Sequence, residues 1–296
     1  MRTLGSFLAL LLGALGVVAV GTYPAWLLLH PHFDFPFHRI GERLGMLALT
    51  AGFVLFARRL GLADRASLGY GLARRAFTRE LALGLALGVL TMALVVATMV
   101  ALGLLDWSPA APRGGAALLG LLALRLLSGL VVAFIEETFL RGALQTGLTR
   151  EVGVTAAVWV TALIYAATHF FAKYHIEAQA VTPGSGLALL GGALRLFATP
   201  GAIIDAFAAL FTVGIALSLV RAATGNIAAC IGLHAGWVWV MLVVHELAQP
   251  RRPAPLDFLL SRFDGFVGWL VCAWTLALLW PLWRFYRVRA SRAGGR

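Results

Sequence analysis

Two adjacent glutamates and two histidines stand in apolar surroundings in the second half of the chain. Glu136 and Glu137 come near the end of one apolar stretch, His169 closes the next, and His234 lies inside a third. A carboxylate in such a place can act as a general base, and an imidazole can assist it or stabilise an oxyanion. One glutamate and two histidines could instead hold zinc. The residue types therefore favour hydrolysis and leave open whether a metal takes part.

The spacing within the first motif separates the two glutamates. Glu137 and Arg141 are four residues apart and can pair on one face of a helix. Glu136 lies about 100° around the helix axis, outside that pair. We therefore predict that Glu137 and Arg141 are structural and that Glu136 is the base. The sequence contains neither H-E-x-x-H nor G-x-S-x-G, which are the motifs of zinc proteases and of serine hydrolases.

Three motifs in this order resemble the CAAX protease and bacteriocin-processing family, also called Abi proteins, which are glutamic-type intramembrane endopeptidases. The motifs are E-E-x-x-x-R at 136–141, an aromatic-x-x-x-His from Tyr165 to His169, and His234 after a Gly-Asn-Ile run. Together they span about residues 118–244. The order and the spacing of all three make the resemblance specific, whereas the first motif alone would be weak.

The resemblance implies a role for each matching residue. Glu136 and His169 would activate the attacking water, and His234 would help to form the oxyanion site. Glu137 and Arg141 would hold the first motif in place.

The chain departs from the family's pattern at two positions. Tyr165 stands where the family often has Phe, which is a mild change. Val238 stands where the family often has Asn, four residues after the last histidine. Valine cannot donate a hydrogen bond, and the loss of one oxyanion donor can cost about 10²–10³ in rate. Asn226 or Trp237 could supply a donor from elsewhere in the fold.

The composition indicates what kind of molecule must position these residues. Of the 296 residues, 60% are hydrophobic and 12% are charged, whereas a soluble domain carries about 25% charged residues. This balance excludes an ordinary soluble enzyme and indicates a polytopic membrane protein. The formal net charge is +11, but the basic residues stand in short runs between apolar stretches. The positive-inside rule explains such runs without a nucleic acid partner.

We predict an all-α bundle of about eight transmembrane spans with one interfacial or re-entrant helix. The spans cover about residues 4–29, 44–57, 81–105, 116–140, 154–171, 202–220, 227–244 and 265–285, and the shorter helix covers 187–198. The stretch from Arg141 to Gly153 is predicted to be a polar connection.

The chain is interpreted as a single membrane domain, residues 1–296. Within it, residues 1–115 hold variable N-terminal spans, 116–244 the motif-bearing catalytic core, and 245–296 a loop, the last span and a basic tail.

The most basic loop, residues 58–80, marks the cytoplasmic side. With eight spans both termini lie on that side, and the setting is predicted to be a bacterial inner (plasma) membrane. These boundaries put Glu136 near the cytoplasmic end of its span and His169 at the opposite end. The two can meet if the fifth helix is tilted or shorter, or if the number of spans differs by one.

The sequence thus predicts an intramembrane endopeptidase that needs no cofactor, with zinc as a minor alternative. Its partners would be the lipid bilayer and a protein or peptide substrate at the membrane. Two other classes stay open. One is a non-catalytic immunity or scaffold protein of the same fold, which Val238 favours. The other is a proton-coupled transporter that uses Glu136, His169 and Asp205 as a relay, although no inverted repeat supports it.

Overall fold

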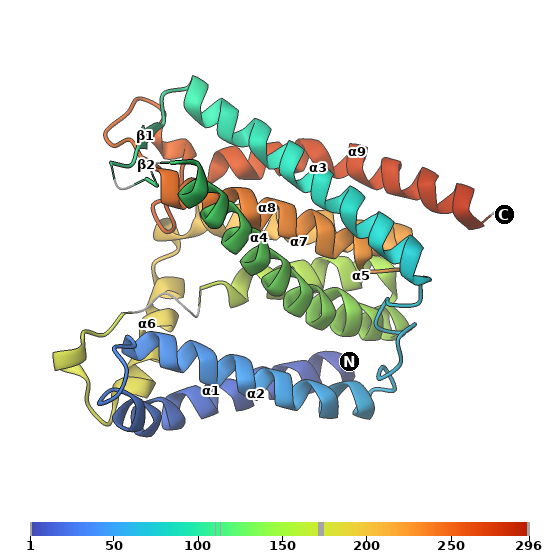
Figure 1. Ribbon diagram of the computed structural model, residues 1–296. Helices are drawn as coiled ribbons and strands as arrows, with labels where there is room; N and C mark the ends of the chain where they lie inside the picture. Colours follow the sequence, from blue (N-terminus) through green and yellow to red (C-terminus); the bar gives the residue numbers. More distant parts are fainter. Residues whose placement is uncertain (1, 110, 113, 171–174, 295–296) are drawn as a thin grey trace.

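Long apolar segments form helices in this protein because the backbone of a helix satisfies its own hydrogen bonds where no water is present. The computed structural model describes residues 2–109, 111–112, 114–170 and 175–294. The α-helices, labelled in Figure 1, are α1 (Arg2–Leu29), α2 (Phe37–Arg59), α3 (Arg74–Ala101), α4 (Gly115–Glu137), α5 (Gln145–Thr168), α6 (Ser185–Ala198), α7 (Ile204–Thr224), α8 (Ala228–Leu247) and α9 (Trp269–Gly294).

Shorter elements join these helices. They are the π-helix η1 (Thr138–Leu144), the 3-10 turns η2 (Ala178–Ala180), η3 (Pro200–Ala202) and η4 (Asp257–Leu259), and the strands β1 (Leu105–Trp107) and β2 (Ala248–Pro250). The two strands pair antiparallel, with Leu105 opposite Pro250.

The predicted fold class is confirmed: the protein is an all-α polytopic bundle. In the described part of the chain, six segments are long and apolar enough to cross a membrane: α1, α2, α3, the continuous stretch 115–168, α7 and α8. The stretch 115–168 contains both the fourth and the fifth predicted spans, and α6 corresponds to the predicted interfacial or re-entrant helix. The last predicted span corresponds to α9, which is not among the six. The number of eight spans therefore stays a prediction.

The predicted polar connection between Arg141 and Gly153 is wrong. The helix that begins at Gly115 continues through η1 and the first turns of α5, and the chain turns back only at Gly153, whose φ is +82°. Glu136 stands about 17 residues before this turn and His169 about 16 residues after it. At 1.5 Å per residue, both lie about 25 Å from the turn, and hence at one depth. Because the fourth helix is longer than predicted, Glu136 and His169 do not lie at opposite ends of their spans.

Glycines let α3 and α8 pack backbone to backbone. Gly84 and Gly88 on α3 face Gly232 and Gly236 on α8. A Cβ atom on Gly232 would lie 2.1 Å from the carbonyl oxygen of Leu81, and one on Gly88 would lie 2.4 Å from a carbonyl oxygen of α8. Small residues with this spacing allow the close approach that stabilises helix pairs in membranes. The contact fixes the depth and the rotation of α8.

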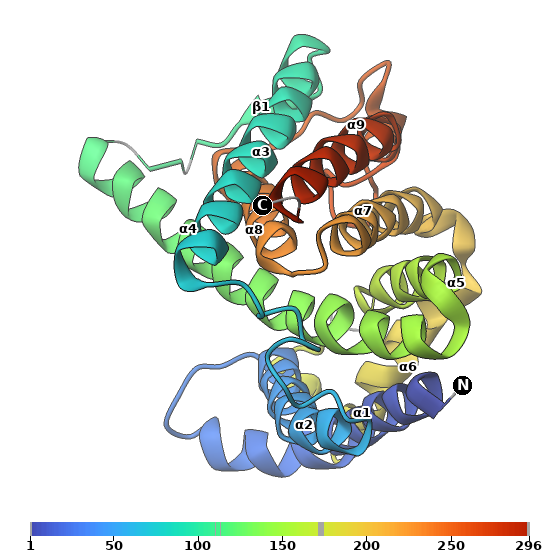
Figure 2. The same cartoon turned by 90° about the vertical axis from the view of Figure 1, so that its right-hand side faces the viewer.

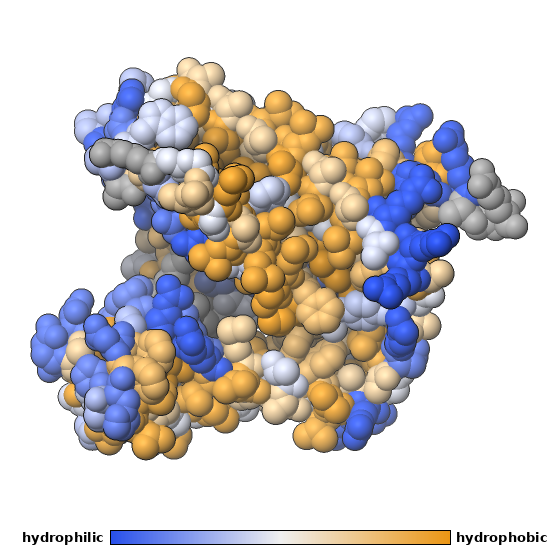
Figure 3. Space-filling view, viewed as in Figure 1, coloured by the Kyte–Doolittle hydropathy of each residue, from blue (hydrophilic) through white to orange (hydrophobic). Residues whose placement is uncertain are grey.

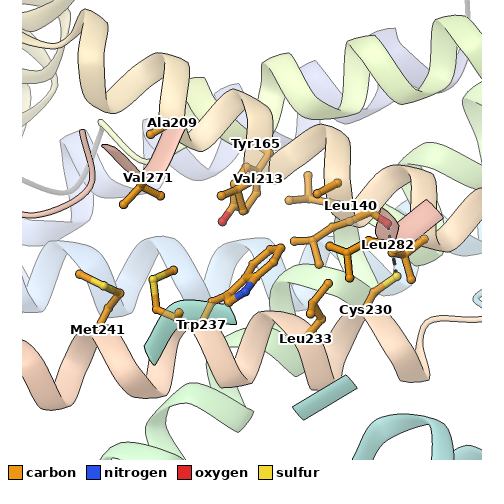
Figure 4. Close-up of a cluster of buried hydrophobic side chains, with 14 of the residues drawn as sticks. Leu140, Tyr165, Ala209, Val213, Cys230, Leu233, Trp237, Met241, Val271 and Leu282 are labelled. Atoms are coloured by element: carbon orange, nitrogen blue, oxygen red, sulfur yellow. Dashed lines mark hydrogen bonds between the residues drawn. The ribbon is translucent and has the colours of Figure 1, made fainter. Parts of the chain in front are cut away.

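The core lies mainly between α3, α5, α7, α8 and α9, and the same buried cluster extends to Phe7 of α1 and Phe56 of α2. Figure 4 shows Leu233 and Trp237 of α8 in one buried cluster with Tyr165 of α5 and Val213 of α7. Trp237 also donates its indole N–H to Oγ1 of Thr91 on α3 at 2.9 Å. The motif-bearing helices α5 and α8 are therefore held together by packing against α3 and α7.

Helices α1, α2 and α6 form a second group beside this core, as Figures 1 and 2 both show. The group touches η1 and α5 through α1, and α2 touches η1 through the rings of Phe53 and Phe139. The backbone N–H and the hydroxyl of Thr3 donate to Oε1 of Glu151 at 2.8 and 2.7 Å. A Cβ atom on Gly147 would lie 2.6 Å from Thr3, so the two groups meet closely at this end. At the opposite end Figure 3 shows the surface hollowed between them.

Candidate active site

Glu137 is the centre of a buried polar cluster. Its Oε1 accepts a hydrogen bond from Nη1 of Arg141 at 3.0 Å and another from Nδ1 of His234 at 2.8 Å. Neither Glu137 nor Arg141 has any exposed surface. Arg141 also donates to the carbonyl oxygen of Gly214 at 3.0 Å and lies over the ring of Tyr165, 4.7 Å from its centroid. The cluster thus joins η1, α5, α7 and α8.

The bond to Glu137 sets the roles of the two nitrogens of His234. An ionised carboxylate can only accept, so Nδ1 is the donor. Nε2 is left to face Oε2 of Glu136 at 4.0 Å. This distance is too long for a hydrogen bond, but a single water could contact both atoms.

Glu136 turns toward a cavity rather than toward Arg141. Its side chain is 32% exposed, and its Oε2 atom is buried without a hydrogen-bond partner. A buried carboxylate oxygen that lacks a partner is costly, and this one adjoins a histidine. Such an atom is suited to bind water or a substrate group.

His169 lies at the same cavity, directly after α5. Its Nδ1 lies 2.7 Å from the carbonyl oxygen of Tyr165, which can only accept, so Nδ1 is the donor and Nε2 keeps a lone pair. The ring of Tyr165 contacts both imidazoles, 4.4 Å from that of His169 and 5.9 Å from that of His234. The ring centroids of His169 and His234 are therefore no farther apart than the sum of these two distances.

The cavity has a volume of about 460 Å³ and lies between the two groups of helices. Helices α1, α2 and α6 form one wall, and α4, η1 and the end of α5 form the other. The lining is mostly apolar, and the polar side chains in it are His38, Glu42, Thr50, Glu136, Thr168 and His169. The structure therefore brings Glu136 and His169 to a common space at membrane depth.

Sequence reasoning did not assign His38 and Glu42 to the site. Both lie on α2, four residues apart and on one face of the helix. Each lines the cavity from the wall opposite Glu136. No motif singled them out, and only their spacing on an apolar span could have drawn attention to them.

Asn226 and Trp237 are used elsewhere in the fold. Oδ1 of Asn226 accepts the backbone N–H of Ala228 at 3.0 Å, and its Nδ2 donates to the carbonyl oxygen of Thr224 at 3.2 Å. Asn226 is thus bonded to the first residue of α8, about two helical turns before His234. The indole N–H of Trp237 is bonded within the core. The structure does not bring either donor to the cavity.

Asp205 also stays apart from the cluster. It stands in the first turn of α7, where its Oδ1 accepts the backbone N–H of Ala206 at 2.8 Å. Among the residues described, no group of three His, Cys, Asp or Glu side chains is arranged to hold a metal ion. The described geometry therefore offers neither a relay through Asp205 nor a set of three such ligands.

A helical bundle with these carboxylates and imidazoles at a cavity of membrane depth defines an integral membrane protein with a buried polar site. Residues 118–240 match the model of the family described as type II CAAX prenyl endopeptidase Rce1-like. The resemblance predicted from the three motifs is thereby confirmed for this segment of the chain. Comparisons with curated proteins and with solved structures gave no match. The matched segment omits α1 and α2, which form half of the cavity.

Proposed function

We propose that the protein is an intramembrane endopeptidase that hydrolyses a peptide bond of a membrane-associated protein or peptide. The observation that carries this proposal is the short approach of Glu136 Oε2 to His234 Nε2 at 4.0 Å. Glu136 lines the apolar cavity, and the buried His234 lies behind it. A carboxylate and an imidazole so placed can share one water and one substrate carbonyl.

In the proposed reaction Glu136 takes a proton from a water molecule while the water oxygen attacks the carbonyl carbon of the substrate. The lone pair on Nε2 of His169 orients that water. Nε2 of His234 donates a hydrogen bond to the oxyanion, while its Nδ1 donates to Glu137. Glu136 then passes its proton to the leaving amine, which restores the carboxylate.

The charges of the cluster fit this scheme. When His234 carries a proton on both nitrogens, it and Arg141 balance Glu136 and Glu137. A buried cluster without net charge avoids the desolvation cost of an unpaired ion.

The cavity suits a substrate with an apolar or lipid segment. Its volume of about 460 Å³ lies within the range of ligand sites. The name of the matching family refers to CAAX prenyl endopeptidases, whose substrates end in a prenylated cysteine and three further residues. A farnesylated peptide is therefore the first probe to use.

The test is cleavage of an internally quenched farnesyl-cysteine peptide by the protein in proteoliposomes. Glu136→Gln keeps the shape of the side chain and removes the base, so the rate is expected to fall by about 10²–10⁴-fold. Glu246→Gln is the matched control, because this carboxylate pairs with Arg125 outside the cavity. We expect that variant to retain its rate.

Equal cleavage by wild type and Glu136→Gln would contradict the proposal. If the wild-type protein cleaved none of the peptides that are processed in cells, the result would favour the non-catalytic alternative that Val238 suggests. We also propose that the reaction needs no metal: incubation with a chelator should leave the rate unchanged, and a loss restored by zinc would overturn this part.

A further inference from the structure

Most of the arginines lie at one end of the bundle. Three contacts place the chain segments there together: Arg2 donates to the carbonyl oxygen of Arg59, Arg289 pairs with Glu80, and the N–H of Ile227 donates to the loop before α3. The exposed or half-buried arginines at this arginine-rich end are Arg2, Arg58, Arg59, Arg65, Arg74, Arg75, Arg79, Arg150, Arg221, Arg287, Arg289 and Arg292, and the acidic residues described there are Asp64, Glu80 and Glu151.

The opposite end has mixed charge. It contains the β1–β2 pair, the chain between α1 and α2, and the described residues after α5. Its arginines within the described ranges are Arg39, Arg43, Arg195, Arg251, Arg252 and Arg262, and its acidic residues are Asp34, Glu42, Asp106, Glu177, Asp205, Glu246, Asp257 and Asp264. Some of these charges are paired directly, as in Arg251 with Asp106 at 2.7 Å. The positive-inside rule therefore makes the arginine-rich end cytoplasmic and the mixed end extracytoplasmic.

The cavity is closed toward the arginine-rich end. The rings of Phe53 and Phe139 lie 4.3 Å apart, and those of Phe7 and Phe56 lie 6.0 Å apart. Phe7 and Phe56 are each only 5% exposed. These four aromatic side chains fill the space between α1, α2 and η1 on that side.

The cavity opens toward the mixed end. His38 and Glu42 lie in the first turns of α2, and His169 follows the last turn of α5. All three line the cavity, and Figure 3 shows the hollow between the two groups of helices on this side. Water and a peptide can therefore enter from the mixed end without passing the aromatic closure.

From this we infer that the candidate site opens to the extracytoplasmic side. Its substrate class is then an exported or membrane-anchored peptide whose cleavage site lies on that side, next to an apolar stretch that fills the cavity. This inference rests on the proposed function. A prenylated C-terminus of a cytoplasmic protein would meet the closed end instead.

Orientation is tested first, without any cleavage. Ala63 and Ala178 are both exposed and stand at the arginine-rich and the mixed end, respectively. Ala63→Cys and Ala178→Cys change no charge, and the wild type is the background control because Cys230 and Cys272 are buried. In intact cells a membrane-impermeant maleimide should label Ala178→Cys, and Ala63→Cys only after the membrane is permeabilised. The reverse pattern, or equal labelling of both in intact cells, overturns the inference.

The second experiment tests the substrate side. Wild-type membranes are prepared as right-side-out and as inverted vesicles, and a water-soluble quenched peptide with one apolar stretch is added outside. We expect at least about a tenfold higher rate with right-side-out vesicles, which corresponds to 1.4 kcal/mol. Faster cleavage with inverted vesicles overturns the inference but keeps the proposed function. The proposed function is contradicted if neither kind of vesicle cleaves the peptide, or if Glu136→Gln does not reduce the cleavage. In that case the labelling experiment alone decides the orientation.

Discussion

At the scale of single residues, Glu137 holds two partners that lie on different helices. Arg141 reaches it from η1 and His234 from α8, and both bonds end on the same oxygen. The pair of Glu137 and Arg141 is therefore a structural support for the imidazole. Buried ion pairs of this kind add little net stability, but the removal of one partner leaves an unpaired charge.

Glu137→Gln should accordingly destabilise the protein by about 3–5 kcal/mol, because Arg141 would be left buried without a counter-charge. Thermal unfolding in detergent micelles measures this. Glu42→Gln is the comparison, since its partner Arg39 has a side chain that is 60% exposed and the pair should contribute about 0–1 kcal/mol. Similar melting temperatures for the two variants would argue against a supporting role for Glu137.

Val238 lies one turn after His234 on the same face of α8 and offers no donor. Because Asn226 and Trp237 are bonded elsewhere, Val238→Asn should raise the cleavage rate, by up to about 10²–10³-fold if the new amide reaches the oxyanion. Single-turnover kinetics gives the rate of the chemical step. Val240→Asn puts the same polar group on another face of α8 and should bring no gain. An unchanged or lower rate for Val238→Asn would exclude a missing donor at this position.

At the scale of elements, α8 carries His234 and is positioned by its glycines. They allow contacts with α3 that no side chain could replace, because the atoms opposite belong to the backbone. The π-helix η1 has a comparable role for the first motif. It follows Glu136 and Glu137 directly, and π-helical turns often occur at functional sites. Tyr70, in the loop before α3, hydrogen-bonds to Thr138 in this turn.

Gly232→Ala should force α3 and α8 apart, because the added methyl group would lie 2.1 Å from the carbonyl oxygen of Leu81. Overpacking costs about 1–3 kcal/mol, and the shift of α8 should also lower the cleavage rate. Gly120→Ala in α4 is the matched control, since nothing lies within 4 Å of its added Cβ and alanine favours the helix. Thermal unfolding of both variants distinguishes them, and equal stability would refute the role of close packing.

At the scale of the whole molecule, the sequence predicted the membrane bundle and the family that residues 118–240 resemble. Apolar runs and the spacing of Glu136, Tyr165, His169 and His234 are local patterns, so they can be seen in one sequence. The boundaries of the fourth helix could not be predicted from the sequence, because Arg141 and Gln145 look like loop residues until their buried partners are known. Gln145, for example, donates to the carbonyl oxygen of Ser218 on α7.

A water-accessible cavity is expected from the chemistry, but its lining could not be predicted, because the cavity forms between two groups of helices that lie far apart in the sequence. His38 and Glu42 belong to a span without any recognised motif, and only tertiary packing brings them opposite Glu136. The catalytic roles proposed for Glu136, His169 and His234 stay predictions. The structure adds the distances between these side chains and their hydrogen-bond partners.

The two-group architecture leads to a final prediction about substrate binding. Met46, which is 49% exposed, lines the cavity from α2, whereas the next residue, Leu47, is 67% exposed and does not line it. Met46→Trp should fill part of the cavity and lower kcat/KM for a peptide with a long apolar segment by about 10–200-fold, the effect of 1–3 kcal/mol in an apolar pocket. A peptide with a shortened apolar segment should lose less. Leu47→Trp, with the same bulk directed toward lipid, should leave both rates unchanged. If Leu47→Trp and Met46→Trp impaired the two peptides equally, the cavity between the helix groups would not be where the substrate binds.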